Sequence, residues 1–361
     1  MNEIETGLYA INVKNMVSML SNAYVSLIKS NTPFRNFPSV MLWGPPGVGK
    51  SQGVREVAQV IERETDKKVN ITDVRLLLFN PVDLRGIPTS NEDKTLAVWL
   101  KPKIFQMDES EDTVNILFLD EISAAPPSVQ AAAYQITLDR TVGEHTLPDN
   151  CIVIAAGNRV TDKSVAYNMP RALANRLCHF EIKGDSGSWH DWAVERGLHE
   201  YVIGYLEYNP VALLRLGMSV ADLAFPTPRS WEIVSNILNS VQGSFKELYP
   251  LIVGCIGIET ATGFKTWVGL YKNMPPIKDI FLGKSVPVPK ASELLIALRS
   301  AMVAYARKNP EQLLIDNSVD FACKLPWTFR GKLLHDYHLI PKVRPIIEKN
   351  DVYITAMGER K

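Results

Sequence analysis

The sequence predicts an α/β protein, in which a parallel β-sheet with helices on both faces is followed by an all-helical region. Three observations support this fold class. Strand-like and helix-like segments alternate from about residue 39 to residue 184, a pattern typical of parallel strands joined by right-handed crossovers. A glycine-rich loop joins the first of these strands to a helix. After about residue 187 the apolar periodicity is helical, with no convincing strand.

The elements of the first region follow from hydrophobic periodicity. Residues 13–28 carry apolar side chains at three- and four-residue steps, which predicts an amphipathic helix. The prolines of SNTPFRNFPS end this helix. A second helix is predicted for GVGKSQGVREVAQVIERE. Short apolar runs predict strands at residues 39–43, 115–121 and 151–158, an alternating pattern predicts one at 69–78, and residues 178–183 are a fifth candidate.

The second region is expected to be helical. The segment GDSGS at 184–188 marks the exit from the first region. We therefore expect two domains, residues 1–186 with the sheet and residues 187–361 with the helices. A proline-rich stretch at 272–290 interrupts the helical patterns, which occupy residues 189–197, 199–210, 229–242, 247–271, 291–309 and 311–325.

Composition limits the classes of function. The 361-residue chain has 39 basic and 39 acidic side chains, so its net charge does not indicate a protein that coats nucleic acid. The four cysteines lie far apart, which disfavours a zinc site or a disulfide and favours a reducing compartment. No signal peptide and no apolar run of bilayer length is visible. We expect a cytoplasmic protein that does not bind a membrane.

The loop after the first strand predicts a phosphate site. Residues 44–51, GPPGVGKS, fit the pattern G-x-x-x-x-G-K-[ST] in full. Backbone N–H groups of such a loop face an anion, and the N-terminus of the following helix adds its own. Lys50 is expected to reach the β- and γ-phosphates, and the Ser51 hydroxyl to bind Mg²⁺. The predicted nucleotide-binding residues are Gly44, Pro45, Pro46, Gly47, Val48, Gly49, Lys50, Ser51 and Gln52.

Polar residues after two later strands extend this site. Asp120 and Glu121 follow the run NILFL, at the carboxyl edge where ligands of open α/β sheets bind. Asp120 is expected to hold the Mg²⁺ ion, and Glu121 to orient and deprotonate the attacking water. Asn158 ends the run CIVIAAG and is expected to help fix that water. Solvated turns are the alternative interpretation for these residues, but the phosphate loop upstream favours catalysis.

These motifs together resemble those of the AAA+ ATPases, over roughly residues 10–240. The segment FNPVDLRGIPTSNEDKTLAVWLKPKIF looks like the insert in the second helix of the MoxR-like branch (the dynein-related AAA subfamily), here near residues 80–104. The segment SVQAAAYQITLDRTVGEHTLPDNCIVIAAGN resembles the branch's pre-sensor hairpin, near 138–150, and its sensor strand. The resemblance implies a P-loop AAA+ α/β/α core with an all-helical C-terminal lid domain and extra C-terminal helices. Asp139 departs from the pattern, which has a glutamate there.

The resemblance also implies roles for arginines. MPRALANRLCHFEI matches the segment after the sensor strand, which makes Arg176 the candidate arginine finger for a neighbouring subunit's nucleotide, with Arg171 as a second candidate. FPTPRSWEIV resembles the helix start that carries the second sensor arginine, here Arg229. Thr227 is expected to cap this helix and Pro228 to be its first residue. An ordinary surface arginine is the alternative for Arg229.

The resemblance implies an ATP-hydrolysing motor that works as a homo-oligomeric ring, a hexamer, with ATP and Mg²⁺ as cofactors. No base-reading motif distinguishes ATP from GTP. The work of the motor would be to remodel or activate a partner protein in the manner of a chaperone, since members of the branch often pair with von Willebrand A-domain proteins. One alternative is a nucleic-acid-associated motor, which the neutral net charge disfavours. Another is a nucleotide-gated scaffold with low turnover, which the presence of Glu121 and Asn158 disfavours.

Two further features allow more than one interpretation. Leu96, Val98 and Trp99 of the insert could line a central pore, contact a partner or close the hairpin on its own base. His335 and His338 have the i, i+3 spacing of a metal chelate on a helix. No third ligand is evident, and ordinary histidines are far commoner.

Overall fold

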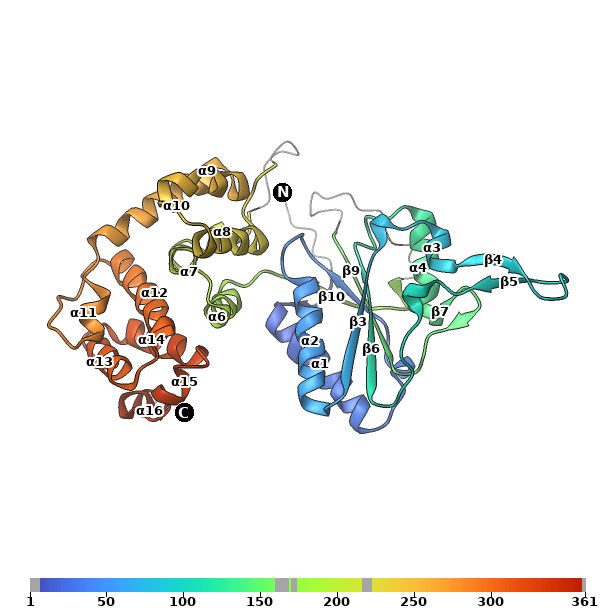
Figure 1. The fold of residues 1–361 in the computed structure, drawn as a ribbon, viewed down its shortest axis with the longest axis horizontal. Helices are drawn as coiled ribbons and strands as arrows, with labels where there is room; N and C mark the ends of the chain where they lie inside the picture. The colour runs from blue at the N-terminus through green and yellow to red at the C-terminus, as the bar shows by residue number, and fades with distance from the viewer. Residues whose placement is uncertain (1–6, 160–168, 170–173, 216–222, 359–361) are drawn as a thin grey trace. The chain divides into compact units, whose positions relative to one another are not determined.

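The computed structural model describes residues 7–159, 169, 174–215 and 223–358. The chain divides into two compact units, Met1–Gly184 and Asp185–Lys361. The first unit contains a parallel sheet with helices on both faces, and the described residues of the second unit form helices joined by loops (Figure 1). The predicted α/β/α core followed by a helical region is therefore confirmed.

The sheet of the first unit has six parallel strands in the order β1-β10-β2-β9-β6-β3. Five of them coincide with predicted strand segments. The additional strand, β1, pairs with β10 through Ala10 and Glu181, and two residues are too few to show a periodicity in the sequence. The strands are β1 (Ala10–Ile11), β2 (Val40–Trp43), β3 (Lys68–Arg75), β6 (Thr113–Asp120), β9 (Cys151–Gly157) and β10 (Cys178–Ile182).

Helices cover both faces of this sheet. Val40 and Leu42 of β2 pack in the apolar cluster that contains α1 and α2, whereas Met41 packs in the cluster with α3 and α4. Successive side chains of a strand point to opposite faces, so a strand buried on both faces reads as a continuous apolar run. This is why the sequence predicts the central strands so clearly. The helices are α1 (Val13–Lys29), α2 (Lys50–Thr65), α3 (Pro81–Arg85) and α4 (Pro127–Asp139).

Two antiparallel hairpins extend the first unit at the predicted insert and pre-sensor segments (Figure 1). The hairpins contact each other, since His145 Nε2 lies 2.8 Å from the carbonyl oxygen of Trp99. Leu96 is 67% exposed at the turn of the first hairpin, whereas Val98 and Trp99 are half-buried. Leu96 therefore does not close the hairpin on its own base, and Trp99 belongs to the junction of the hairpins. Their strands are β4 (Ile87–Ser90) with β5 (Ala97–Leu100), and β7 (Thr141–Val142) with β8 (His145–Thr146).

The second unit is built around two apolar clusters. Trp231 and Phe264 are at the centre of one, and Phe281 and Tyr337 of the other. The segment predicted as helical at 247–271 divides at Gly257, where φ is +76° and a Cβ atom would lie 2.7 Å from the Ala224 carbonyl oxygen. The helices are α6 (Ser186–Arg196), α7 (Glu200–Tyr208), α8 (Pro228–Ser240), α9 (Phe245–Ile256), α10 (Ile258–Leu270), α11 (Ile277–Phe281), α12 (Ser292–Lys308), α13 (Gln312–Ala322), α14 (Trp327–Leu339), α15 (Arg344–Ile347) and α16 (Asp351–Gly358). Within the described ranges, no helix has the length and apolar character needed to cross a lipid bilayer.

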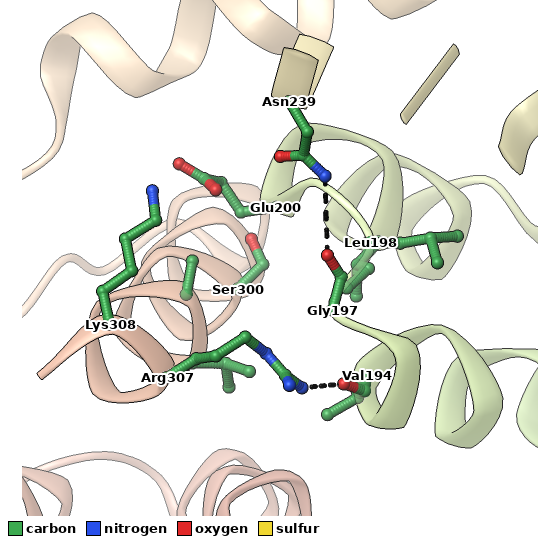
Figure 2. A pocket seen from close by; sticks show the side chains of 11 residues that line it. Val194, Gly197, Leu198, Glu200, Asn239, Ser300, Arg307 and Lys308 are labelled. Carbon is green, nitrogen blue, oxygen red and sulfur yellow. Dashed lines mark hydrogen bonds between the residues drawn. The ribbon is translucent and has the colours of Figure 1, made fainter. Parts of the chain in front are cut away.

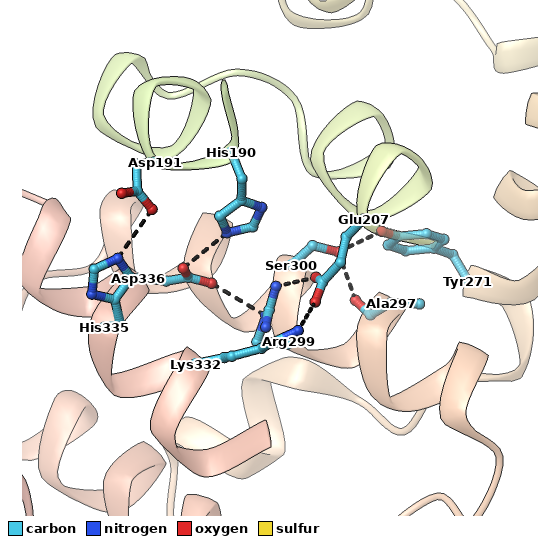
Figure 3. Close-up of polar contacts among 10 residues, drawn as sticks. All are labelled: His190, Asp191, Glu207, Tyr271, Ala297, Arg299, Ser300, Lys332, His335 and Asp336. Carbon is cyan, nitrogen blue, oxygen red and sulfur yellow. Dashed lines mark hydrogen bonds and ion pairs between the residues drawn. The ribbon is translucent and has the colours of Figure 1, made fainter. Parts of the chain in front are cut away.

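A buried ion network joins helices α6, α7, α12 and α14 of the second unit (Figure 3). Arg299 pairs with Glu207, and its Nε atom lies 3.2 Å from Asp336 Oδ2. His190 Nε2 lies 2.9 Å from the other carboxylate oxygen of Asp336. Burial raises the pKa of Asp336, but the charge of Arg299 and the hydrogen bond from His190 outweigh burial and hold the pKa below its ordinary value. The network therefore keeps a charged carboxylate inside the helical unit.

Candidate nucleotide-binding site

The phosphate loop connects β2, which ends at Trp43, to α2, which begins at Lys50. Gly47 has φ +77° and Gly49 has φ +105°, values that glycine adopts at no steric cost. Gly44 approaches β10 so closely that a Cβ atom would lie 2.5 Å from the Ile182 carbonyl oxygen. The glycines of the motif are thus required by the backbone of the loop. The helix that follows directs its first N–H groups into the loop.

The Lys50 ammonium lies at the centre of the loop. It donates to the carbonyl oxygens of Gly44 and Pro45 over 2.5 and 3.0 Å, and to Asn158 Oδ1 over 3.1 Å. Lys50 is 8% exposed. A buried lysine held by carbonyl and amide oxygens is a strong point charge for an anion.

Ser51 and Asp120 also meet across the site. The Ser51 hydroxyl donates to Asp120 Oδ2 over 2.8 Å. The other carboxylate oxygen, Oδ1, accepts from the backbone N–H of Glu121 over 2.9 Å. A hydroxyl and a carboxylate side by side are hard oxygen ligands of the kind that Mg²⁺ prefers.

Glu121 has an unusual backbone conformation directly after β6. Its φ is +59°, the left-handed region that non-glycine residues rarely adopt. Such backbone strain concentrates at functional sites. The hydrogen bond from the Glu121 N–H to Asp120 helps to hold this conformation, so the two acids form one rigid corner at the carboxyl edge of the sheet.

Asn158 follows β9, and the packing beneath it is tight. Its backbone N–H donates to the Ser123 hydroxyl over 2.9 Å. A Cβ atom on the preceding Gly157 would lie 2.8 Å from Ser123 Oγ and 2.9 Å from Met41 Cε. Ser123 is a site residue that the sequence reasoning missed, and a small hydroxyl two residues after the acidic pair is its only signal in the sequence.

The strand order explains why these residues converge. Strands β2, β9 and β6 are consecutive in the sheet, and the phosphate loop, Asn158 and the acidic pair follow them in that order. In a parallel sheet all carboxyl ends lie at one edge. Of the other predicted loop residues, Val48 is buried, Pro46 is half-buried, and Gln52 donates to Glu56 Oε1 over 3.2 Å.

The predicted arginines belong to other elements of the chain. Arg176 is exposed in the turn before β10, and Arg171 lies outside the described residues. Arg229 is exposed in the first turn of α8, in the second unit. The expected start of this helix is confirmed, because the Thr227 side chain accepts from Ser230 N–H over 3.1 Å and Pro228 is the first helical residue.

The second unit has a small pocket between α6, α7, α8 and α12, which no predicted site residue lines (Figure 2). Arg307 fills one side and donates to the carbonyl oxygen of Val194.

The two histidines with chelate spacing contact other side chains. His335 Nε2 lies 3.0 Å from Asp191 Oδ1, and His338 Nδ1 lies 2.9 Å from the Tyr353 hydroxyl. In the part of the chain that the structure describes, no three His, Cys, Asp or Glu side chains are grouped to hold a metal.

Residues 39–179 match the model of the ATPase family associated with various cellular activities (AAA). The matched segment contains Lys50, Asp120, Glu121 and Asn158, so the candidate site lies within the part of the chain that is similar to this family. No curated protein matches the sequence significantly.

Several solved structures are similar at low identity. A mutant of RuvB from Thermotoga maritima is 14% identical with a TM-score of 0.35, over 93% of this chain and 86% of that one. PCH-2 from C. elegans is 14% identical with a TM-score of 0.34, over 71% of this chain and 68% of that one. A DNA polymerase III gamma subunit-related protein from Thermotoga maritima is 9% identical with a TM-score of 0.35, over 94% of this chain and 96% of that one.

Proposed function

We propose that this protein is an ATP hydrolase of MoxR type, which works in an oligomeric ring to remodel or activate a partner protein. The convergence of Lys50, Ser51, Asp120 and Asn158 at one edge of the sheet carries the proposal. A glycine loop alone binds a phosphate. An adjacent acidic corner and an amide add the groups that hydrolysis requires.

Each residue has a role that follows from its chemistry. The loop N–H groups and the Lys50 ammonium bind the phosphates. Glu121 accepts a proton from the attacking water, a contribution of about 10²–10⁴-fold for a general base. Asn158 orients that water. Its side-chain oxygen accepts from Lys50, and its backbone N–H donates to the Ser123 hydroxyl, which holds the residue in place.

The Ser51 and Asp120 oxygens fit a magnesium ion. The hydrogen bond between them, 2.8 Å long, holds both oxygens at the start of α2. When bound, the ion would offset the negative charge that develops on the phosphates.

Arg176 is assigned to the nucleotide of a neighbouring subunit. Its side chain is exposed in the turn before β10, and a guanidinium has a permanent charge and a planar donor fork suited to phosphate. Arginine fingers contribute about 10³–10⁵-fold to turnover. Turnover per subunit should therefore rise with protein concentration as rings assemble. Arg229, exposed in the first turn of α8, is proposed separately as the second sensor arginine.

The first experiment is the turnover of Glu121→Gln. We expect ATP hydrolysis to fall by about 10²-fold or more, while ATP binding is retained, because Lys50 and the loop are untouched. Glu109→Gln, at an exposed position of the same unit, is the matched control and should hydrolyse ATP normally. Unchanged turnover in Glu121→Gln would contradict the assignment of Glu121 as the base.

The second experiment mixes two inactive variants. In a ring formed from Arg176→Ala and Glu121→Gln subunits, an intact Arg176 can face an intact Glu121 of its neighbour. We expect partial recovery of hydrolysis in the mixture, with Arg63→Ala, another exposed arginine, as a fully active control. A mixture as inactive as its components would refute the action of Arg176 between subunits.

The partner protein can be found with the Glu121→Gln variant. In ATP this variant should hold the loaded state, and a partner of von Willebrand A-domain type should then co-purify with it. The exposed Leu96 of the β4–β5 hairpin offers a contact for such a partner. Release of the partner when ATP is replaced by ADP would support remodelling. Equal co-purification of the partner in ATP and in ADP would argue against it.

A further inference from the structure

His179 on β10 makes two hydrogen bonds in which none of the predicted site residues takes part. Trp43, the last residue of β2, donates its indole N–H to His179 Nδ1 over 2.9 Å. On the other side of the ring, His179 Nε2 lies 2.6 Å from the carbonyl oxygen of Ala174. The two rings are nearly parallel, at 16° with centroids 6.1 Å apart. The imidazole therefore bridges the strand before the phosphate loop and the chain segment before β10.

The two partners determine the tautomer of His179. An indole nitrogen only donates and a carbonyl oxygen only accepts. Nδ1 of His179 must accept from Trp43, and Nε2 must carry the proton that is donated to Ala174. A neutral imidazole satisfies both partners at once. Asparagine can reproduce only the acceptor, at the position of Nδ1, and glutamine only the donor, at the position of Nε2.

The Ala174 carbonyl closes the turn that carries Arg176. The backbone N–H of Leu177 donates to the same oxygen over 3.3 Å. Leu177 is buried, whereas Arg176 is exposed. One oxygen thus receives the turn's own hydrogen bond and that of His179, which ties an exposed arginine to the sheet through its backbone.

We propose that His179 is a positioning residue for Arg176, and that Trp43 in turn holds His179. Trp43 is adjacent in sequence to Gly44, so a single pair of side chains connects the phosphate loop to the turn that presents the arginine. The inference rests on the proposed role of Arg176 between subunits. Its physical basis is that misplacement of a catalytic group by about 1 Å can cost about 10²-fold in rate.

The test compares His179→Asn with His179→Gln. The asparagine variant keeps the acceptor for Trp43 and loses the donor to Ala174, whereas the glutamine variant keeps the donor. We expect His179→Asn to lower kcat by about 10–100-fold at ring-forming concentrations with an unchanged KM for ATP. His179→Gln should lose less, because it loses only the hydrogen bond from Trp43. Hydrogen–deuterium exchange of the Leu177 amide should speed up in the asparagine variant alone.

Several outcomes would overturn the proposal. Equal kcat and equal Leu177 exchange in the two variants would show that the donor to Ala174 is not needed. A lower kcat together with a raised KM for ATP in both variants would show that His179 serves only the general packing of β10. In an Arg176→Ala background, His179→Asn should cost no further turnover, and an additive loss would contradict action through Arg176.

The exchange measurement separates this inference from the proposed function. If Arg176→Ala rings hydrolyse ATP at the wild-type rate, the arginine assignment fails. Faster exchange of Leu177 in His179→Asn would then still show that His179 holds the turn, and unchanged exchange would refute that as well.

Discussion

Lys50 and Asn158 are 108 positions apart in the sequence, yet the Lys50 ammonium donates to Asn158 Oδ1 over 3.1 Å. The contact follows from the sheet, in which β2 and β9 are neighbours and Trp43 is paired with Gly157. Lys50 begins the helix after the loop that leaves β2, and Asn158 directly follows β9. The phosphate-binding lysine and the water-orienting amide of the proposed site are therefore connected directly.

Replacement of Asn158 by alanine should lower turnover much more than ATP affinity. The variant removes the amide that would orient the attacking water, and loss of one such group costs about 10²–10³-fold in rate. Lys50 and the loop N–H groups still bind the phosphates. Measurement of kcat beside the dissociation constant of ATP separates the two effects, with the exposed Asn36→Ala as a control. A loss of affinity that equals the loss of rate would contradict the assignment.

Gly157→Ala should disturb the site from beneath. The new Cβ atom would lie 2.8 Å from Ser123 Oγ and 2.9 Å from Met41 Cε, so we expect destabilisation of about 1–3 kcal/mol and reduced hydrolysis. Gly269→Ala is the matched control, because no atom lies within 4 Å of its Cβ position in α10. The free energy of unfolding of that variant should rise by about 0.5–1 kcal/mol. The midpoints of urea unfolding would measure the stability of both variants. A Gly157→Ala variant as stable as wild type would show that Ser123 can move freely.

Arg299→Ala should destabilise the helical unit. Arg299 and Asp336 are each 3% exposed as side chains, and breaking a buried ion pair costs about 3–5 kcal/mol. Lys332 contacts the same Glu207 but is 60% exposed, so Lys332→Ala should cost about 1 kcal/mol or less. Chemical denaturation of the two variants makes the comparison. Equal effects would mean that the buried pair contributes no more than the surface one.

Acid should weaken the helical unit through Asp336. The pKa of Asp336 is lower in the folded protein than its ordinary value of 3.8, because Arg299 and His190 outweigh burial. The carboxylate therefore stabilises the fold above that ordinary value, and this contribution disappears as pH falls through the lower folded pKa. The difference in unfolding free energy between wild type and Asp336→Asn should shrink below about pH 4. A difference that stays constant with pH would contradict the lowered pKa.

Some of this molecule could be predicted from local sequence. GPPGVGKS requires glycines where the backbone has positive φ, at Gly47 and Gly49, and the pattern itself indicates a phosphate loop. Apolar runs predict the central strands β2, β6 and β9 because these strands are buried on both faces. Thr227 and Pro228 predict the start of α8, since capping depends on a few adjacent residues.

Other features depend on residues far apart in the chain. Strand β1 exists because β10 offers it an edge, and two residues have no pattern of their own. The bridge from Trp43 to Ala174 and the network of Arg299, Glu207 and Asp336 are absent from any local pattern, because each joins segments that meet only after the chain has folded. The sequence by itself determined which residues can bind a phosphate and which segments form the longer strands of the sheet. Only the tertiary structure decided which of those residues meet, because strand order and helix packing arise from long-range contacts.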